Sequence, residues 1–148
     1  MITSNRTTDM KVGFTCSTFD LFHAGHVAML REAKTMCDYL IVGLLVDPTV
    51  DRPYTKLKPV QTVFERYLQL KGCRYVDEII PFTTEQEIVD IILTMNPDIR
   101  FVGEEYKGMN HTGLGLCEIY YNKRRHSFSS TELKDRVITN HERRNALK

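Results

Sequence analysis

Short apolar segments alternate along this chain with segments whose apolar residues recur at helical spacing. The stretch 39–47 is almost continuously apolar, which is typical of a strand covered on both faces. Residues 24–37 instead place Val27, Leu30 and Ala33 on one face of a helix. Applied to the whole chain, the pattern predicts strands over 12–16, 39–47, 77–82, 99–102 and 117–121, and helices over 24–37, 60–70, 85–95 and 129–138.

This alternation indicates an α/β fold with a parallel sheet and right-handed crossovers. The length of 148 residues suits a single domain with one core. Because ligands of open α/β sheets bind beyond the carboxyl ends of the strands, we expect functional residues just after each predicted strand. We place the domain at 11–139, after a disordered or flexible N-terminus (1–10) and before a C-terminal tail (140–148) that is frayed or extends the last helix.

The amino-acid composition limits the kinds of partner and the compartment that we expect for this chain. There are 20 Lys and Arg against 19 Asp and Glu, so the chain lacks the basic excess typical of nucleic-acid binding, and we expect no nucleic-acid partner. Its longest apolar stretch is too short to cross a bilayer, so we expect no membrane span. Four scattered cysteines without a C-x-x-C pair, and a polar start without a signal-peptide core, predict a cytoplasmic protein.

Two histidines, His23 and His26, stand three residues apart where the first predicted strand gives way to a helix. Residues at this spacing share a helix face, and a helix N-terminus favours anions such as phosphate. Both imidazoles could donate hydrogen bonds to phosphoryl oxygens as charge develops. Chance, helix capping and a metal pair are the alternatives, although helical metal pairs more often use i, i+4 spacing and no third ligand is evident.

The stretch STFDLFHAGH at 17–26 resembles the signature of the HxGH nucleotidylyltransferase superfamily. The chain is most similar to the bacterial glycerol-3-phosphate cytidylyltransferase family, through ERY at 65–67, RYVDEIIP at 74–81 and SFSSTELK at 127–134. The resemblance covers roughly residues 11 to 137. It implies a single-domain, Rossmann-like parallel sheet with helices on both faces, and a homodimer.

The resemblance also implies a reaction. A small phosphorylated alcohol, with glycerol 3-phosphate the nearest guess, attacks the α-phosphorus of CTP in line and releases pyrophosphate, with Mg²⁺ accompanying the nucleotide and no covalent enzyme intermediate. One alternative is an adenylyltransferase, or a cytidylyltransferase for another phosphate or phosphonate acceptor. Another is a nucleotide-binding module that keeps the fold without the activity.

Residue roles follow from the same resemblance. His23 and His26 contact the triphosphate and stabilise the pentavalent phosphorus, together with Lys56, Lys58 and Arg66 as further catalytic residues. The nucleotide pocket also includes Thr18, Phe19, Gly103, Glu104, Arg124, Ser129, Ser130 and Thr131. The phosphorylated acceptor binds Lys56, Lys58, Arg66 and Arg74.

Local alternatives exist for several of these residues. Lys56 and Lys58 could simply lie on a solvated loop, and Arg66 and Arg74 could form surface ion pairs with neighbouring carboxylates. Ser129 or Ser130 is also a natural helix N-cap, while Asp20 is expected to be structural or to orient the pocket. The chain departs from the family pattern at Ala24, where the family usually has Trp, at Glu104, where it typically has Asp, and at 126–131, HSFSST.

Overall fold

A single parallel sheet organises residues 9–148, the part of the chain that this computed structural model describes. Its strands are β1 (Val12–Ser17), β2 (Tyr39–Leu45), β3 (Glu78–Phe82), β4 (Ile99–Gly103) and β5 (Glu118–Asn122). They lie in the order β3-β2-β1-β4-β5, and every neighbouring pair is parallel. The five strands and the parallel sheet predicted from the sequence are therefore confirmed.

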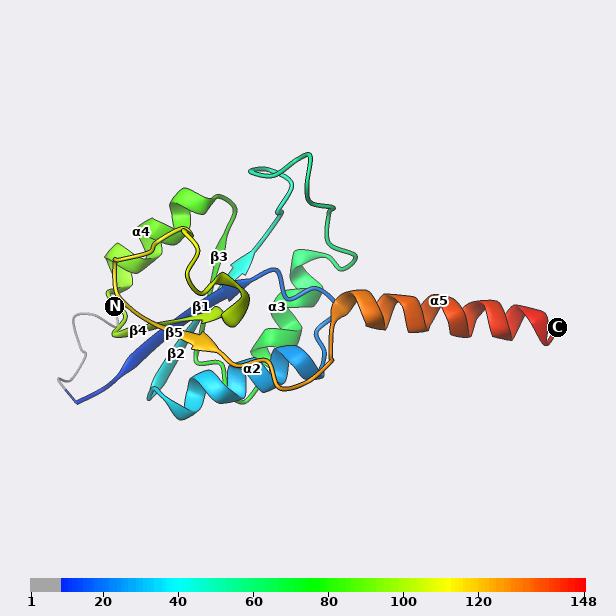
Figure 1. Cartoon of the computed structure of the whole chain (residues 1–148), viewed down its shortest axis with the longest axis horizontal. Helices are drawn as coiled ribbons and strands as arrows, with labels where there is room; N and C mark the ends of the chain where they lie inside the picture. The colour runs from blue at the N-terminus through cyan, green and yellow to red at the C-terminus, as the bar shows by residue number, and fades with distance from the viewer. Residues whose placement is uncertain (1–8) are drawn as a thin grey trace.

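Helices connect the strands and cover both faces of the sheet (Figure 1). They are α2 (Ala24–Thr35), α3 (Val63–Lys71), α4 (Glu85–Met95) and α5 (Ser130–Ala146), with a 3₁₀ turn η1 (Glu104–Tyr106) after β4. Hydroxyl side chains begin three of them, since Thr62, Thr84 and Ser129 each accept a hydrogen bond from a backbone N–H in the first helical turn. Most of the proposed flexible N-terminus, 1–8, lies outside the described residues.

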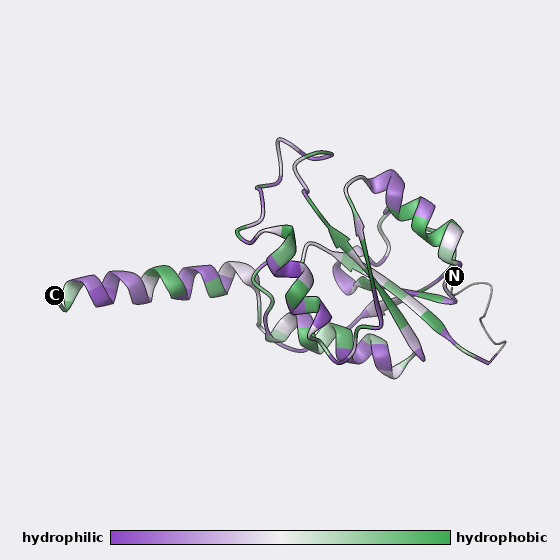
Figure 2. Cartoon of the chain, turned by 180° about the vertical axis from the view of Figure 1, so that it is seen from behind, coloured by the Kyte–Doolittle hydropathy of each residue, from purple (hydrophilic) through white to green (hydrophobic). Residues whose placement is uncertain are grey.

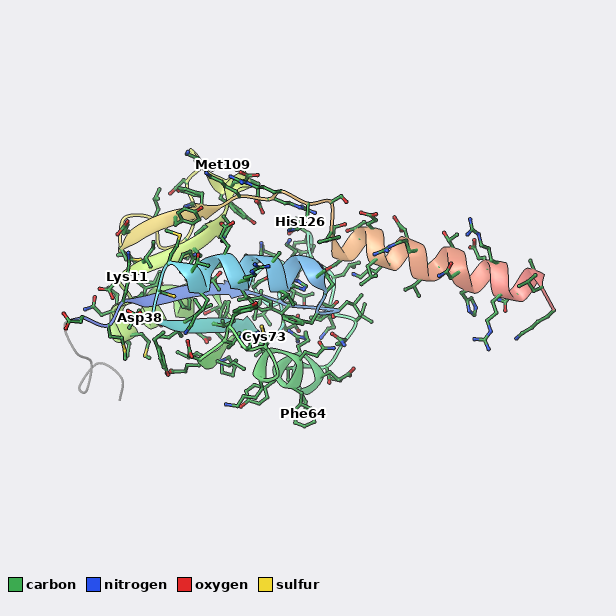
Figure 3. The ribbon with its side chains drawn as sticks, turned by 90° about the horizontal axis from the view of Figure 1, so that it is seen from below. Lys11, Asp38, Phe64, Cys73, Met109 and His126 are labelled. Atoms are coloured by element: carbon green, nitrogen blue, oxygen red, sulfur yellow. The ribbon has the colours of Figure 1, made fainter. Side chains whose placement is uncertain are left out.

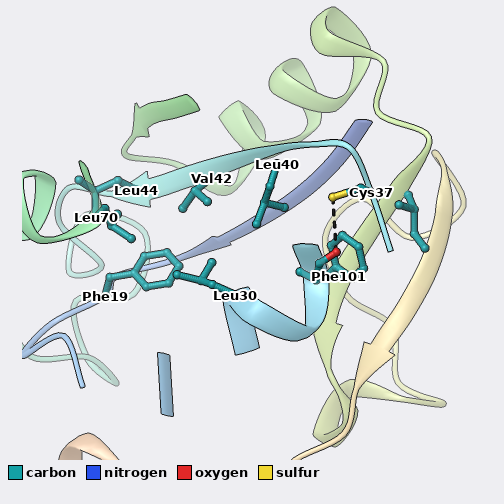
Figure 4. Packing of buried hydrophobic residues seen from close by; sticks show 10 residues of the cluster. Phe19, Leu30, Cys37, Leu40, Val42, Leu44, Leu70 and Phe101 are labelled. Carbon is teal, nitrogen blue, oxygen red and sulfur yellow. Dashed lines mark hydrogen bonds between the residues drawn. The ribbon is translucent and has the colours of Figure 1, made fainter. Parts of the chain in front are cut away.

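The alternation of side chains along β2 creates two cores. Leu40, Val42 and Leu44 pack on one side with residues of α2 and α3, as Figure 4 shows. Ile41 and Leu45 pack on the other side with residues of α4. The sheet is therefore buried on both faces around β2, as the nearly continuous apolar run predicted.

Helix α5 stands away from the rest of the protein (Figure 1). None of its residues is buried, and its surface is mostly hydrophilic (Figure 2). It continues to Ala146, so residues 140–146 are part of the last helix. None of the helices in residues 9–148 is both long enough and apolar enough to cross a membrane.

The strand order reverses at β1, which lies between β2 and β4. From β1 the chain moves outward through β2 to β3, and then returns to the other side of β1 to form β4 and β5. In open α/β sheets the carboxyl ends of the strands diverge at such a reversal, and this is where ligands bind. The turn that follows β1 is therefore placed at the expected ligand site.

Candidate active site

The turn between β1 and α2 has an unusual backbone. Phe19 and Leu21 both have positive φ angles, 52° and 50°, which residues other than glycine rarely adopt. Phe19 is fully buried in the core, and the carboxylate of Asp20 accepts hydrogen bonds from the backbone N–H groups of Val60, at 2.8 Å, and Gln61, at 3.0 Å. These contacts hold the strained turn and place the start of α2, so Asp20 has the structural role expected of it.

His23 and His26 are fixed at the start of α2 by hydrogen bonds to backbone. His23 is the N-cap residue, and its Nδ1 accepts from the N–H of Gly25 at 3.0 Å. The Nδ1 of His26 in turn accepts from the N–H of His23 at 3.1 Å, and the two ring centroids lie 3.9 Å apart. Because Nδ1 is an acceptor in both rings, each neutral imidazole carries its proton on Nε2.

Both histidines have lowered pKa values. Burial is the main cause for His26, whose pKa falls to about 4, and the neighbouring charge of His23 contributes. Burial also lowers the pKa of His23, together with the positive charges of His126 and Arg124. At neutral pH the pair therefore consists of uncharged rings that can offer Nε2–H donors.

A pocket of about 450 Å³ opens where α2 and α5 begin. Its walls come from α2, the carboxyl ends of β4 and β5, and the segment that joins β5 to α5. Its lining residues are His23, Gly25, His26, Ala28, Met29, Glu32, Gly103, Glu105, Asn122, Lys123, Arg124, Arg125, His126, Phe128, Ser129 and Ser130. Two helix N-termini and several cationic side chains thus meet at one cavity, an arrangement suited to a polyanion.

The family model for cytidylyltransferase-like proteins matches residues 14–136. The chain belongs to this family. The family resemblance expected from its motifs is confirmed.

Two curated relatives are cytidylyltransferases by name. The glycerol-3-phosphate cytidylyltransferase of Bacillus subtilis is 33% identical over 129 residues, covering 86% of this chain and 98% of the relative. The probable ethanolamine-phosphate cytidylyltransferase of Encephalitozoon cuniculi is 52% identical over 81 residues, covering 53% of this chain and 25% of the relative.

Other relatives share the domain within longer proteins. The bifunctional protein HldE of Wolinella succinogenes is 37% identical over 113 residues, covering 76% of this chain but 24% of HldE. This match, like that to the Encephalitozoon protein, therefore spans about a quarter of the relative's length.

Solved structures show the same fold. The lipopolysaccharide core biosynthesis protein of Thermoplasma volcanium superposes with a TM-score of 0.57 at 22% identity, covering 89% of each chain. Pantothenate synthetase of Thermus thermophilus gives a TM-score of 0.60 at 15% identity, covering 83% of this chain and 61% of its own. The Rossmann-like architecture is therefore shared at low sequence identity.

Six of the residues that the family resemblance indicated line the pocket together: His23, His26, Gly103, Arg124, Ser129 and Ser130. Thr131 follows directly on α5, while Glu104 accepts a hydrogen bond from the backbone N–H of Arg124 at 3.2 Å. The ring of Phe19 is fully buried behind the pocket, 5.4 Å from the ring of His26 between centroids. Phe19 thus supports the histidine pair from the core.

Arg66 lies outside this group, because its side chain is only 2% exposed and points into the protein. Its guanidinium donates hydrogen bonds to four backbone carbonyls, those of Thr18, Leu45, Val46 and Gln61. Every nitrogen of the guanidinium is used in this way. The structure therefore gives Arg66 a role in joining the carboxyl ends of β1 and β2 rather than a direct contact with a ligand. Arg66 also does not form the surface ion pair with a neighbouring carboxylate that was the alternative interpretation of its sequence position.

The other three basic residues that the family resemblance indicated for the acceptor also lie away from the pocket. Lys56 and Lys58 are exposed on the loop after β2, where the Nζ of Lys58 lies 3.2 Å from a carboxylate oxygen of Asp47. Arg74 precedes β3, at the amino end of the parallel sheet and therefore opposite the pocket, with its guanidinium carbon 5.7 Å from the centre of the Tyr75 ring. The structure does not bring these three side chains to the histidines.

Several pocket residues were not among the sequence candidates. Glu32 of α2 accepts hydrogen bonds from the Nδ2 of Asn122, at 3.1 Å, and from the backbone N–H of Lys123, at 3.2 Å, which ties α2 to the end of β5. Asn122 follows the strand predicted over 117–121, so its place at a strand's carboxyl end was a usable signal. No comparable sequence signal pointed to Glu32 or Glu105. Within residues 9–148, no three His, Cys, Asp or Glu side chains are grouped so that they could hold a metal ion.

Proposed function

We propose that this protein is a cytidylyltransferase that transfers CMP from CTP to a small phosphorylated alcohol, with glycerol 3-phosphate as the nearest candidate. A phosphate oxygen of the acceptor attacks the α-phosphorus in line, the bond to the β-phosphate oxygen breaks, and pyrophosphate leaves. Mg²⁺ enters bound to the triphosphate, as part of the substrate. The proposal extends to this chain the activity named for its relatives in Bacillus subtilis and Encephalitozoon cuniculi.

The observation that carries the proposal is the pair of neutral imidazoles at the start of α2. Because backbone N–H groups occupy both Nδ1 atoms, the donors are the two Nε2–H groups. That of His23 lies 3.1 Å from the Oγ of Ser130, and a ligand oxygen would replace this contact. Fixed donors of this kind stabilise negative charge that develops on phosphoryl oxygens, and they do so without reorganising during the reaction. The chemistry then needs only that the two anions be held in line, without a covalent intermediate.

The positive charge around the pocket supports the same function. Lys123, Arg124 and Arg125 line it, and the N-termini of α2 and α5 open on it. Such a site favours the triphosphate and the departing pyrophosphate. We further propose that the loop carrying Lys56 and Lys58 closes over the pocket when both substrates are bound, so that these lysines reach the acceptor phosphate.

The test is pyrophosphate release with each of the four nucleoside triphosphates and a panel of acceptors that includes glycerol 3-phosphate and ethanolamine phosphate. We expect turnover with CTP and at least one phosphorylated alcohol, and a CDP-linked product by mass spectrometry. Turnover with ATP but not CTP would replace the proposal with adenylyl transfer. Nucleotide binding without turnover for any acceptor would favour a binding module.

We also propose a homodimer. Apolar side chains are exposed on α3, at Phe64 and Leu68, and on α5, at Val137 and Ile138. Light scattering coupled to gel filtration measures the assembly directly, and a mass near that of one chain over the micromolar range would exclude the dimer.

A further inference from the structure

A third histidine, His126, lines the same pocket and has no part in the function proposed above. It lies in the segment between β5 and α5, and Figure 3 shows it beside the start of α5. Its Cε1 is 3.2 Å from the position that a Cβ on Gly25 would occupy, and the Cε1 of His23 is 2.8 Å from that position. The rings of His23 and His126 therefore both lie next to Gly25 in the pocket.

The His126 ring is held in place by its own segment. It stacks on the ring of Phe128, with 4.8 Å between centroids and 21° between planes, and its Nδ1 accepts from the N–H of Phe128 at 3.1 Å. The carbonyl of Phe128 accepts in turn from the guanidinium of Arg124 at 2.7 Å. The ring is thus oriented before any ligand arrives, and a preorganised donor loses little conformational freedom on binding.

These contacts also determine which ring nitrogen is available. With Nδ1 accepting a backbone hydrogen bond, the neutral ring carries its proton on Nε2, as in His23 and His26. Among residues 9–148, nothing forms a hydrogen bond with this Nε2. All three histidines of the pocket therefore use backbone to fix Nδ1 and keep a proton on Nε2.

We propose that His126 donates its Nε2–H to the β- or γ-phosphate of the nucleotide, an assignment that rests on the proposed transferase function. In the proposed reaction His23 and His26 act at the α-phosphorus, so we assign the donor of the neighbouring segment to the phosphates beyond it. His126 belongs with Arg124, Ser129 and Ser130 to the segment that leads into α5, and this segment meets the start of α2 where the Nε2 of His23 lies 3.1 Å from the Oγ of Ser130. His126 thus contributes one hydrogen bond to the pyrophosphate leaving group. It does so from the segment 126–131, which departs from the family pattern.

Two substitutions separate this role from a structural one. In His126→Asn, the side-chain oxygen can still accept from the N–H of Phe128, but nothing replaces the Nε2–H donor. In His126→Gln, the longer amide places an N–H donor near the position of Nε2 and loses the local contact. If His126 binds phosphate, Asn weakens binding of CTP and inorganic tripolyphosphate by ~10-fold, the value of one hydrogen bond to a charged acceptor, and Gln restores most of it.

Calorimetric titrations with tripolyphosphate, CTP and CMP make the test. We expect the Asn variant to lose affinity for tripolyphosphate and CTP but to bind CMP like the unmodified protein. His141→Asn, on the exposed outer part of α5, is the matched control and should change none of the three. The assignment is overturned if the Asn variant binds tripolyphosphate normally, if it loses CMP to the same extent, or if Gln is as defective as Asn.

The same titrations distinguish this inference from the proposed function. If the unmodified protein transfers CMP to no acceptor, the transferase function is rejected. If the Asn variant nevertheless loses tripolyphosphate binding, His126 remains a polyphosphate-binding residue. Normal turnover by the Asn variant, with unchanged affinities, would reject the role of His126 alone. Thermal unfolding of both variants shows whether a loss of affinity comes from misfolding. If the Asn variant is misfolded, the affinity of the Gln variant is compared with that of the unmodified protein instead.

Discussion

Replacing Arg66 with methionine removes a buried guanidinium while keeping a side chain of similar length. The substitution leaves four carbonyls without their donor, those of Thr18, Leu45, Val46 and Gln61. These carbonyls belong to the strained turn after β1, the end of β2 and the segment before α3. Arg66→Met therefore tests whether this arginine holds the protein together or serves the substrate.

The magnitude can be worked from these contacts. A hydrogen bond from a charged donor contributes about 1.5–3 kcal/mol, so four of them represent a large gross stabilisation. Burial opposes it, and desolvation lowers the pKa of Arg66, with the carboxylates of Asp20 and Asp47 acting in the opposite direction. Breaking a buried charged network of this kind costs about 3–5 kcal/mol net. That is a large share of the roughly 5–15 kcal/mol by which a domain is stable.

The assay is urea unfolding followed by circular dichroism, with the midpoint and slope both fitted. Arg66→Lys should be intermediate, because one ammonium group reaches fewer of the carbonyls. Arg74→Met is the matched control, since Arg74 is exposed and should cost less than ~1 kcal/mol. The reasoning is refuted if Arg66→Met unfolds within about 1 kcal/mol of the original protein while its catalytic rate collapses, because that pattern belongs to a substrate contact.

Three further predictions concern the start of α2. His23→Ala and His26→Ala should each lower kcat by ~10²-fold with a smaller change in nucleotide affinity, measured by pyrophosphate release, and an unchanged rate in both would exclude the proposed role. Gly25→Ala should slow turnover by up to ~10²-fold, because the new Cβ would lie 2.8 Å from the Cε1 of His23 and displace the ring; normal kinetics would contradict this placement. Stability should fall by about 2–3 kcal/mol as the pH drops from 6.5 towards 4, because the unfolded chain protonates His26 at its ordinary pKa of 6.5 whereas the folded protein does so only near 4. Urea unfolding across this range should show a flatter profile in His26→Gln, and an equally steep one would contradict the assignment.

The sequence predicted the architecture because each strand carries a clear apolar pattern. The strand predicted over 39–47 is β2, Tyr39–Leu45, which is buried on both faces. The last helix was predicted to end at 138, since the apolar spacing fades there, yet α5 continues to Ala146. A polar helix without a packing face leaves no periodic signal, so its end could not be located from the apolar pattern.

The site was predictable where a residue follows a strand or begins a helix, as His23 and Ser129 do. It was less predictable where long side chains are concerned. An arginine in the middle of a helix usually faces solvent, and nothing local indicates that Arg66 is buried against carbonyls from two distant segments. Likewise, the bond between Glu32 and Asn122 joins residues 90 positions apart, which only the folded sheet brings together.

The reciprocal hydrogen bonds of His23 and His26 close the first turn of α2 as a serine and a glutamate commonly do in other helices. In the proposed function, the groups offered to the substrate and the groups that start the helix are therefore the same two side chains. A substitution chosen to remove donors from the pocket also removes a helix cap worth about 1 kcal/mol, so rates of such variants have to be compared at temperatures where α2 is intact. Anyone transferring this site to a designed protein would gain the cap together with the donors, and would need no other residue to begin the helix.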